Sequence, residues 1–232
     1  MMTIAAFGDS IARGIGDLGV GNDVPAWPGR LAHRLGQTRH LNLARAGARV
    51  EDVITDQLGD YRVPDADVAL LSAGGNDLLD RHFEPDRFAQ GLTVVLRSLR
   101  RSTSVVVIVT LPDHSMAWPL PRRVREGLRR RIVAVNAIIR DLAGSHDHII
   151  DQWTEEWIQA PGMRHPDRVH LSPAGYQALA DRTAQGLGLP LVHPPLPIRA
   201  AQQGCAWRPS LPSPRDLRRG LRRVPVLAQM GT

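Results

Sequence analysis

The chain has 232 residues, which suits one domain with a full hydrophobic core and a short appendage. Its single cysteine, Cys205, excludes an intrachain disulfide and a cysteine-based metal cluster. The formal net charge of +6 comes from the segment after Ile198, which holds seven arginines and one acid, whereas residues 1–198 carry equal numbers of arginines and acids. We therefore expect no nucleic-acid partner.

The N-terminus enters an apolar strand pattern almost at once. It shows no basic stretch followed by a long apolar run, so we expect no signal peptide. Nor is any apolar run long enough to span a bilayer. A cytoplasmic location is the expectation that follows.

Alternating strand and helix patterns run along the chain. Apolar runs predict five strands, in order Thr3–Phe7, His40–Ala44, Val68–Ser72, Val105–Val109 and His148–Asp151. The third and fourth runs are continuous, which is typical of strands buried on both faces. Helical spacing of apolar residues predicts the main helices at Trp27–Leu35, Glu51–Leu58, Pro85–Arg101, Pro121–Leu142 and Pro173–Leu187.

This alternation indicates right-handed crossovers and a parallel sheet with helices on both faces. We predict a three-layer α/β/α sandwich with a five-stranded parallel sheet, of the flavodoxin type, over residues 1–189. Residues 190–232 are rich in proline and arginine and are predicted to form an extended or disordered C-terminal extension. Its arginine cluster, residues 215–223, suggests weak contact with an anionic membrane, and a solvated tail is the alternative.

Polar residues follow the predicted strands where a parallel sheet places its ligands. Gly8-Asp9-Ser10 follows the first strand, Asn42 to Gly47 the second, and Gly74-Gly75-Asn76-Asp77 the third. Asp167-Arg168-Val169-His170 comes after the fifth. A serine, a histidine, a carboxylate, an amide and glycine N–H groups are what acyl transfer requires.

Each of these stretches alone has a plainer interpretation. Ser10 could cap the next helix, and Asn76 could belong to a glycine-rich turn in which asparagine tolerates a left-handed conformation. Asp167 could cap a turn beside a surface histidine. The two-residue gap between Asp167 and His170 nevertheless lets the carboxylate reach the imidazole Nδ1 locally, without long-range precision.

Taken together, the four stretches resemble the SGNH, or GDSL, hydrolase family of esterases and lipases, in the order that the family shows. The resemblance covers residues 3–188 and continues through Leu171-Ser172-Pro173-Ala174-Gly175-Tyr176. One departure is Ile11, where leucine usually follows the serine.

The resemblance implies Ser10 as nucleophile, His170 as base and Asp167 as its partner. It also implies an oxyanion hole made by the N–H groups of Ser10 and Gly47 and by the Asn76 side chain. No cofactor and no metal are implied, and the expected partner is a small-molecule ester; the oligomeric state stays open. Asp9 belongs to the motif but is predicted to be structural.

Two further histidines lie near these motifs in the sequence. His114 follows the fourth strand, and a substrate-facing or surface loop is the favoured interpretation of its surroundings. His165 has no partner at a spacing that indicates a function.

The predicted function is hydrolysis of a carboxylic ester or thioester through an acyl-enzyme on Ser10. An acyltransferase that uses the same triad is one alternative, and a non-catalytic member of the fold that binds an acyl or carbohydrate ligand is the other.

Overall fold

The computed structural model describes residues 1–17, 25–58 and 65–198. Five parallel strands form one sheet in the order β2-β1-β3-β4-β5, which is the flavodoxin-like order. The strands are β1 (Met2–Gly8), β2 (Thr38–Asn42), β3 (Ala66–Ser72), β4 (Thr103–Val109) and β5 (Asp147–Ile150). The predicted α/β fold with a five-stranded parallel sheet is confirmed.

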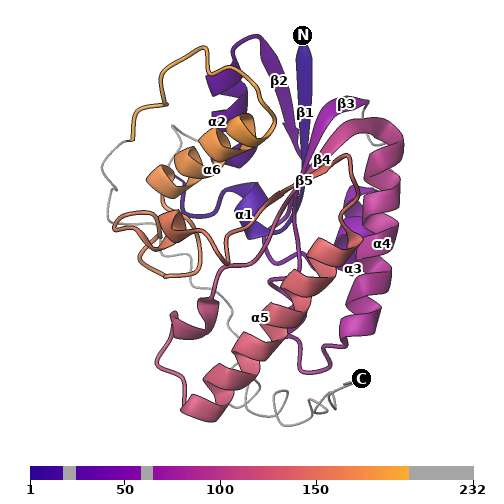
Figure 1. Ribbon diagram of the computed structural model, residues 1–232, viewed down its shortest axis with the longest axis vertical. Coiled ribbons are helices and arrows are strands. Elements are labelled where there is room, and N and C mark those ends of the chain that lie inside the picture. The colour runs from indigo at the N-terminus through magenta and orange to yellow at the C-terminus, as the bar shows by residue number, and fades with distance from the viewer. Residues whose placement is uncertain (18–24, 59–64, 199–232) are drawn as a thin grey trace.

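Helices of the described ranges cover both faces of the sheet (Figure 1). They are α1 (Ser10–Arg13), α2 (Ala26–Leu35), α3 (Val50–Asp52), α4 (Pro85–Ser102), α5 (Arg122–Leu142) and α6 (Pro173–Gly186). A π-helix, Val53–Gln57, continues α3, and 3-10 turns lie at Asp77–Leu79, His114–Met116 and Glu156–Gln159. The predicted caps of α6 are present, because Ser172 accepts the N–H of Gly175 and Pro173 follows it.

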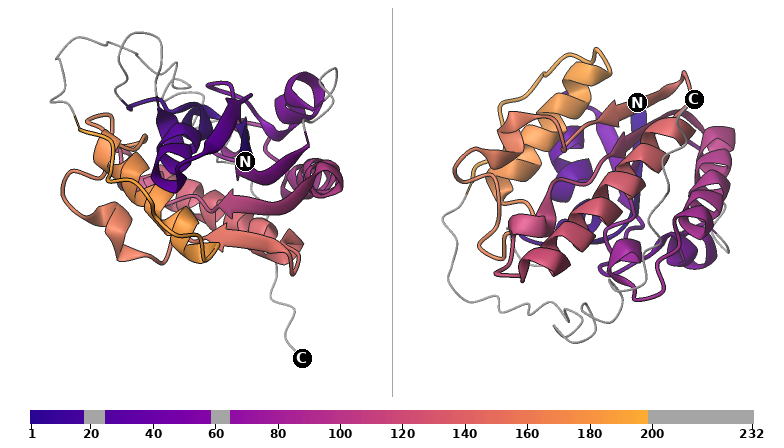
Figure 2. Two further views of the ribbon diagram at one scale, coloured as in Figure 1. Left: turned by 90° about the horizontal axis from the view of Figure 1, so that it is seen from above. Right: turned by 60° about the horizontal axis from the view of Figure 1, so that its bottom comes forward.

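The two faces of the sheet carry separate hydrophobic cores, seen from two further directions in Figure 2. Helices α3, α4 and α5 cover one face and contribute Leu92, Leu96 and Ile132 to its core. Helices α2 and α6 pack on the other face and against each other, with Trp27 and Tyr176 among its buried residues. The buried part of β1, from Ile4 to Gly8, separates the two cores, so the end of β1 is held from both sides.

A buried ion pair ties the segment after α1 to α2. Arg30 donates to both carboxylate oxygens of Asp17, at 2.8 and 2.6 Å, and to Gln177 at 3.3 Å. Removing one partner of such a buried ion pair is strongly destabilising, because the other charge is then left buried without its partner. Its position fixes where the chain leaves α1 and enters the layer formed by α2 and α6.

Most elements differ from their predicted bounds by one or two residues, and two differ in a way that has a physical cause. Strand β2 begins at Thr38, two residues before the predicted start, and ends at Asn42, whose side chain accepts the N–H of Ala44. The predicted helix over residues 51–58 is a single α-turn followed by a π-helix, in which the N–H of Leu58 donates to the carbonyl of Val53.

The predicted C-terminal extension lies mostly outside the described residues, and the arginine cluster at 215–223 lies entirely outside them. Within the described ranges, no helix combines the length and the apolarity that a membrane crossing requires. The domain boundary at residue 189 and the contact with anionic membranes stay predictions.

Candidate active site

Ser10 lies at the carboxyl end of the central strand. β1 ends at Gly8, which has a φ of +114°, and a Cβ there would lie 1.8 Å from the carbonyl oxygen of Ser72. Only glycine fits this turn. Asp9 caps the short helix that follows, because its carboxylate accepts the N–H of Ile11 at 3.0 Å. The cap is therefore Asp9, and the Ser10 hydroxyl is left to contact another side chain.

That side chain is His170. Its Nε2 lies 2.9 Å from the Ser10 Oγ, and its Nδ1 lies 2.7 Å from the Asp167 Oδ2. The His170 ring is almost fully buried, with 3% of its side chain exposed, whereas Asp167 is 16% exposed. The structure thus brings together three side chains that are separated by up to 160 residues in sequence.

The Asp167 carboxylate has three hydrogen-bond partners, the His170 ring and two backbone N–H groups. Its Oδ1 accepts the backbone N–H groups of Val169 and His170, at 2.9 and 3.0 Å. Burial raises the pKa of Asp167, but the hydrogen bonds from the His170 ring and from these N–H groups outweigh it and hold the pKa well below its ordinary value. Asp167 is consequently ionised whenever His170 is neutral, and an acceptor always faces the His170 Nδ1.

Asn76 and Gly47 lie on two loops that meet beside the Ser10 turn. The Asn76 Nδ2 donates to the carbonyl of Ala48 at 3.0 Å, which uses one of its two hydrogens. The N–H of Arg45 donates to the carbonyl of Gly8 at 3.0 Å and anchors the Gly47 loop next to Ser10. Over the described part of the chain, the N–H groups of Ser10 and Gly47 donate to no protein acceptor.

A second layer of polar contacts holds the Ser10 turn, and sequence reasoning missed it. The buried Gln57 side chain accepts the N–H of Gly8 at 2.7 Å and donates to its carbonyl at 2.9 Å. Ser72 donates its hydroxyl to Asp9 at 2.8 Å. The wide turn of the π-helix delivers Gln57 to this position. In the sequence, only the inward helical position of this glutamine indicates that its side chain could reach the Ser10 turn.

Asp9 has a structural role as a helix cap, as the sequence predicts. Its carboxyl group also has a shifted pKa. Burial raises its pKa to about 6, although the hydrogen bonds from Ser72 and Ile11 lower it. The folded protein therefore binds the Asp9 proton more tightly than the unfolded chain does. The stabilising contribution of Asp9 to the free energy of unfolding is fully present below pH 4, and it is lost as the pH rises through about 6.

We expect Asp9→Asn to have nearly wild-type stability near pH 3.5, because a neutral amide then replaces an acid that is neutral in the folded protein and mostly neutral in the unfolded chain. Near pH 7 the variant should be more stable than wild type by about 2–3 kcal/mol, the amount that the Asp9 pKa shift represents. Urea unfolding at the two pH values measures this. A stability difference that does not change with pH would contradict it.

His114 and Arg164 lie beside the His170 ring. The His114 Nδ1 is 3.4 Å from the Arg164 Nη1, and removal from water, aided by the charges of Arg164 and His170, lowers the pKa of His114 to about 3. His114 is therefore neutral near pH 7. Its neighbour Asp113 pairs with Arg129 on the surface at 3.2 Å.

The sequence offers His165 no partner at a spacing that indicates a function, but the structure gives it one. Its Nδ1 lies 3.0 Å from the Asp167 Oδ2, the same oxygen that His170 contacts. His165 and Asp167 lie in one tight turn, which the N–H of Arg168 closes by donating to the carbonyl of His165 at 2.8 Å, and the left-handed conformation of Arg168, with a φ of +64°, is where the chain turns on toward His170.

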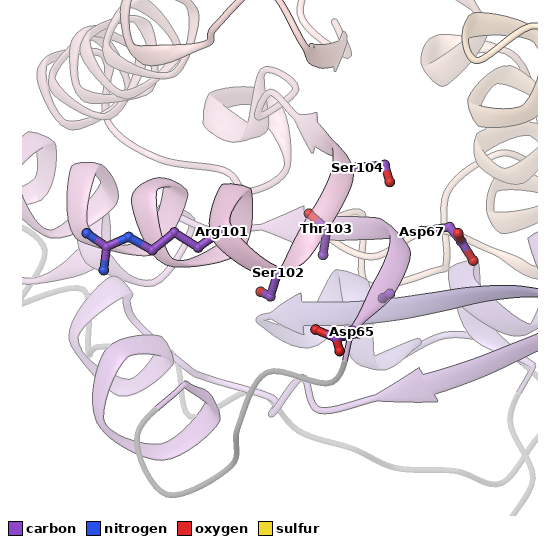
Figure 3. A pocket seen from close by; sticks show the side chains of 7 residues that line it. Asp65, Asp67, Arg101, Ser102, Thr103 and Ser104 are labelled. Atoms are coloured by element: carbon purple, nitrogen blue, oxygen red, sulfur yellow. The ribbon is translucent and has the colours of Figure 1, made fainter.

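A surface hollow lies at the other edge of the sheet, away from this site. It measures about 390 Å³ and is lined by the polar side chains at the amino-terminal ends of β3 and β4 (Figure 3). There Asp67 accepts the N–H of Thr3 at 2.7 Å. A parallel sheet places its ligands at the opposite edge, where Ser10 lies, so we assign no function to this hollow.

The solved structures most similar to this chain are hydrolases of low sequence identity. They include LAE5, an α/β hydrolase from the metagenome of Lake Arreo, Spain (20% identity, TM-score 0.65, covering 81% of this chain and 95% of that one). A lipase/acylhydrolase from Enterococcus faecalis has 23% identity and a TM-score of 0.61, with 81% and 97% covered. Axe2, an acetylxylan esterase from Geobacillus stearothermophilus, has 16% identity and a TM-score of 0.60, with 83% and 96% covered.

A comparison with curated proteins found no significant match. The model of the GDSL-like lipase/acylhydrolase family matches residues 6–178, which include the Ser10 turn, both neighbouring loops and the segment that carries Asp167 and His170. The family catalyses ester hydrolysis, and the sheet order and the similar structures agree with that assignment. The chain belongs to the GDSL-like lipase/acylhydrolase family and is a carboxylic ester hydrolase.

Proposed function

We propose that this hydrolase cleaves esters through a covalent acyl-enzyme on Ser10. The observation that carries the proposal is the continuous contact from the Ser10 Oγ to the His170 Nε2, at 2.9 Å, and from its Nδ1 to Asp167, at 2.7 Å. An ionised Asp167 keeps the proton of a neutral imidazole on Nδ1. The Nε2 lone pair therefore faces the Ser10 hydroxyl, as a general base must.

The reaction has two halves that His170 connects. In the first, the Ser10 Oγ attacks the ester carbonyl while the His170 Nε2 takes its proton. The tetrahedral intermediate then expels the alcohol, to which His170 returns the proton, and Ser10 is left acylated. In the second half, a water molecule attacks the acyl-enzyme while the His170 Nε2 takes one of its protons, and the tetrahedral intermediate then releases the carboxylic acid as His170 returns that proton to the Ser10 Oγ.

Asp167 stabilises the imidazolium that forms in each half. Its negative charge faces the proton on the His170 Nδ1, and burial of the His170 ring strengthens this attraction relative to water. The carboxylate does not need to take the proton itself. Its low pKa is consistent with a partner that stays charged throughout.

The oxyanion is proposed to bind to three donors. The N–H groups of Ser10 and Gly47 donate to no described residue, and Asn76 has one amide hydrogen left after its bond to Ala48. Donors that are held in place by the fold stabilise the developing charge without reorganisation. The bond to Ala48 fixes the Asn76 amide, which supports this role.

The contact between Ser10 and His170 disfavours the non-catalytic alternative, because a binding protein has no need of an aligned nucleophile and base. The acyltransferase alternative uses the same acyl-enzyme and differs only in the acceptor. A short acyl group is a suitable first substrate, since the similar protein Axe2 is an acetylxylan esterase.

The test is partitioning of the acyl-enzyme between water and an added alcohol. We expect p-nitrophenyl acetate and phenyl acetate to give the same ratio of transfer product to acetate at a fixed alcohol concentration, because both form one acetyl-enzyme. Product analysis by chromatography measures the ratio. Ratios that depend on the leaving group would contradict a common intermediate, and transfer that dominates at low alcohol concentration would favour the acyltransferase.

A further inference from the structure

We propose that His165 is a positioning residue that holds the Asp167 carboxylate for His170. This inference rests on the proposed function, because it concerns the acid of the proposed triad. Its starting observation is that the Asp167 Oδ2 lies 2.7 Å from the His170 Nδ1 and 3.0 Å from the His165 Nδ1. Two imidazoles from one loop thus share one carboxylate oxygen.

The proton of the His165 ring can be placed from its neighbours. Its Nδ1 also lies 3.4 Å from the backbone nitrogen of Asp167, which would require it to accept. The contact with the ionised carboxylate oxygen is shorter, and two lone pairs at 3.0 Å would repel. We infer that the His165 Nδ1 carries the proton, so that its N–H edge lies against the negative Asp167 oxygen in an attractive polar contact.

The backbone holds His165 where this bond can form. Its N–H donates to the carbonyl of His170 at 3.0 Å, and its carbonyl accepts the N–H of Arg168 at 2.8 Å. Neither bond uses the His165 side chain. Substitution of the ring should consequently leave the loop in place while removing only the donor to Asp167.

Packing connects His165 to the segment that carries the nucleophile. A Cβ built on Gly16 would lie 3.2 Å from the His165 Cβ and 3.3 Å from its Cγ, so the ring base packs directly against Gly16. Gly16 follows α1, the helix that Ser10 begins. His165 thus contacts both Asp167 and the segment that follows the helix of the nucleophile, Ser10.

The consequence for catalysis follows from the distribution of donors. The two N–H groups on Oδ1 leave the carboxylate free to tilt about the line of those bonds, and His165 supplies a second fixed point on Oδ2, opposite the His170 ring. A carboxylate fixed on both oxygens keeps the His170 Nε2 aimed at Ser10. Without His165, more of the His170 population should lie out of line with the Ser10 hydroxyl.

The test compares His165→Leu, which removes the donor, with His165→Asn, whose Nδ2 can donate from nearly the same place. With p-nitrophenyl acetate, we expect kcat to fall about tenfold in His165→Leu and KM to stay within about twofold, because the loss affects orientation and not substrate binding. His165→Asn should recover most of the lost kcat. The rate of Ser10 inactivation by a fluorophosphonate should follow the same order.

A double-mutant comparison separates positioning from a merely structural role. In an Asp167→Ala background, His165→Leu should cause no further loss of kcat, because its target is gone. An equal loss in both backgrounds, or wild-type kcat in His165→Leu, would overturn the inference. Failure of the proposed function would be seen differently, as retention of turnover when Ser10 itself is removed.

Discussion

Ser10→Ala should lower kcat for a small ester by about 10³-fold or more, because the proposed mechanism passes through a covalent bond to this oxygen. The fold should survive. The cap of α1 is the Asp9 carboxylate, and the Ser10 hydroxyl contacts only His170 among the described side chains. Steady-state turnover together with urea unfolding measures both effects.

Ser102→Ala is the matched control for this loss. Ser102 also carries a partly buried hydroxyl, but it donates to the backbone carbonyls of Ser98 and Leu99 at the end of α4, beside the hollow at the far edge of the sheet. The turnover of the Ser102→Ala variant should equal that of the wild-type protein. Near-wild-type turnover in Ser10→Ala, with the protein freed of wild-type contamination, would remove Ser10 from the mechanism.

Asn76→Ala should lower kcat by about 10²- to 10³-fold, the usual cost of one oxyanion donor. The KM should change much less, because the amide binds the charge that develops in the transition state and not the neutral carbonyl of the ester. The variant also loses the bond to Ala48, so its unfolding free energy should fall by about 1 kcal/mol.

Asn136→Ala distinguishes this effect from simple destabilisation. The Asn136 side chain is buried and makes two 2.8 Å hydrogen bonds to the backbone of Leu111. Its loss should therefore lower stability at least as much as Asn76→Ala does, while kcat per folded molecule stays near wild type. Equal kcat losses in the two variants would show that Asn76 acts through stability alone.

The central strands could be predicted because their residues are buried on both faces and so form continuous apolar runs. Ile4 and Phe7 in β1, with Leu70 and Leu71 in β3, have no exposed area. Strand β2 lies at the edge of the sheet and its three middle residues are exposed, so no apolar run marks its start. For this reason the predicted bounds of β2 lie two residues later than the observed ones.

The polar contacts that hold the site could not be predicted in the same way. Gln57 reaches Gly8 across 49 residues, and Ser72 reaches Asp9 across 63, through tertiary packing that no local pattern encodes. The motif residues themselves could be predicted because strand ends share one edge of a parallel sheet. The contact between His165 and Asp167 depends on a turn closed by the N–H of Arg168, which sequence spacing does not indicate.

The central claim is that Ser10 is the nucleophile and that His170 activates it. Intact-protein mass spectrometry after brief exposure to a fluorophosphonate, followed by peptide mapping, tests it most directly. We predict a single adduct on the peptide that contains Ser10 in wild type, no adduct in Ser10→Ala, and an adduct that forms at least about 10³-fold more slowly in His170→Ala. An adduct on another residue, or labelling of Ser10 at the wild-type rate in His170→Ala, would contradict it.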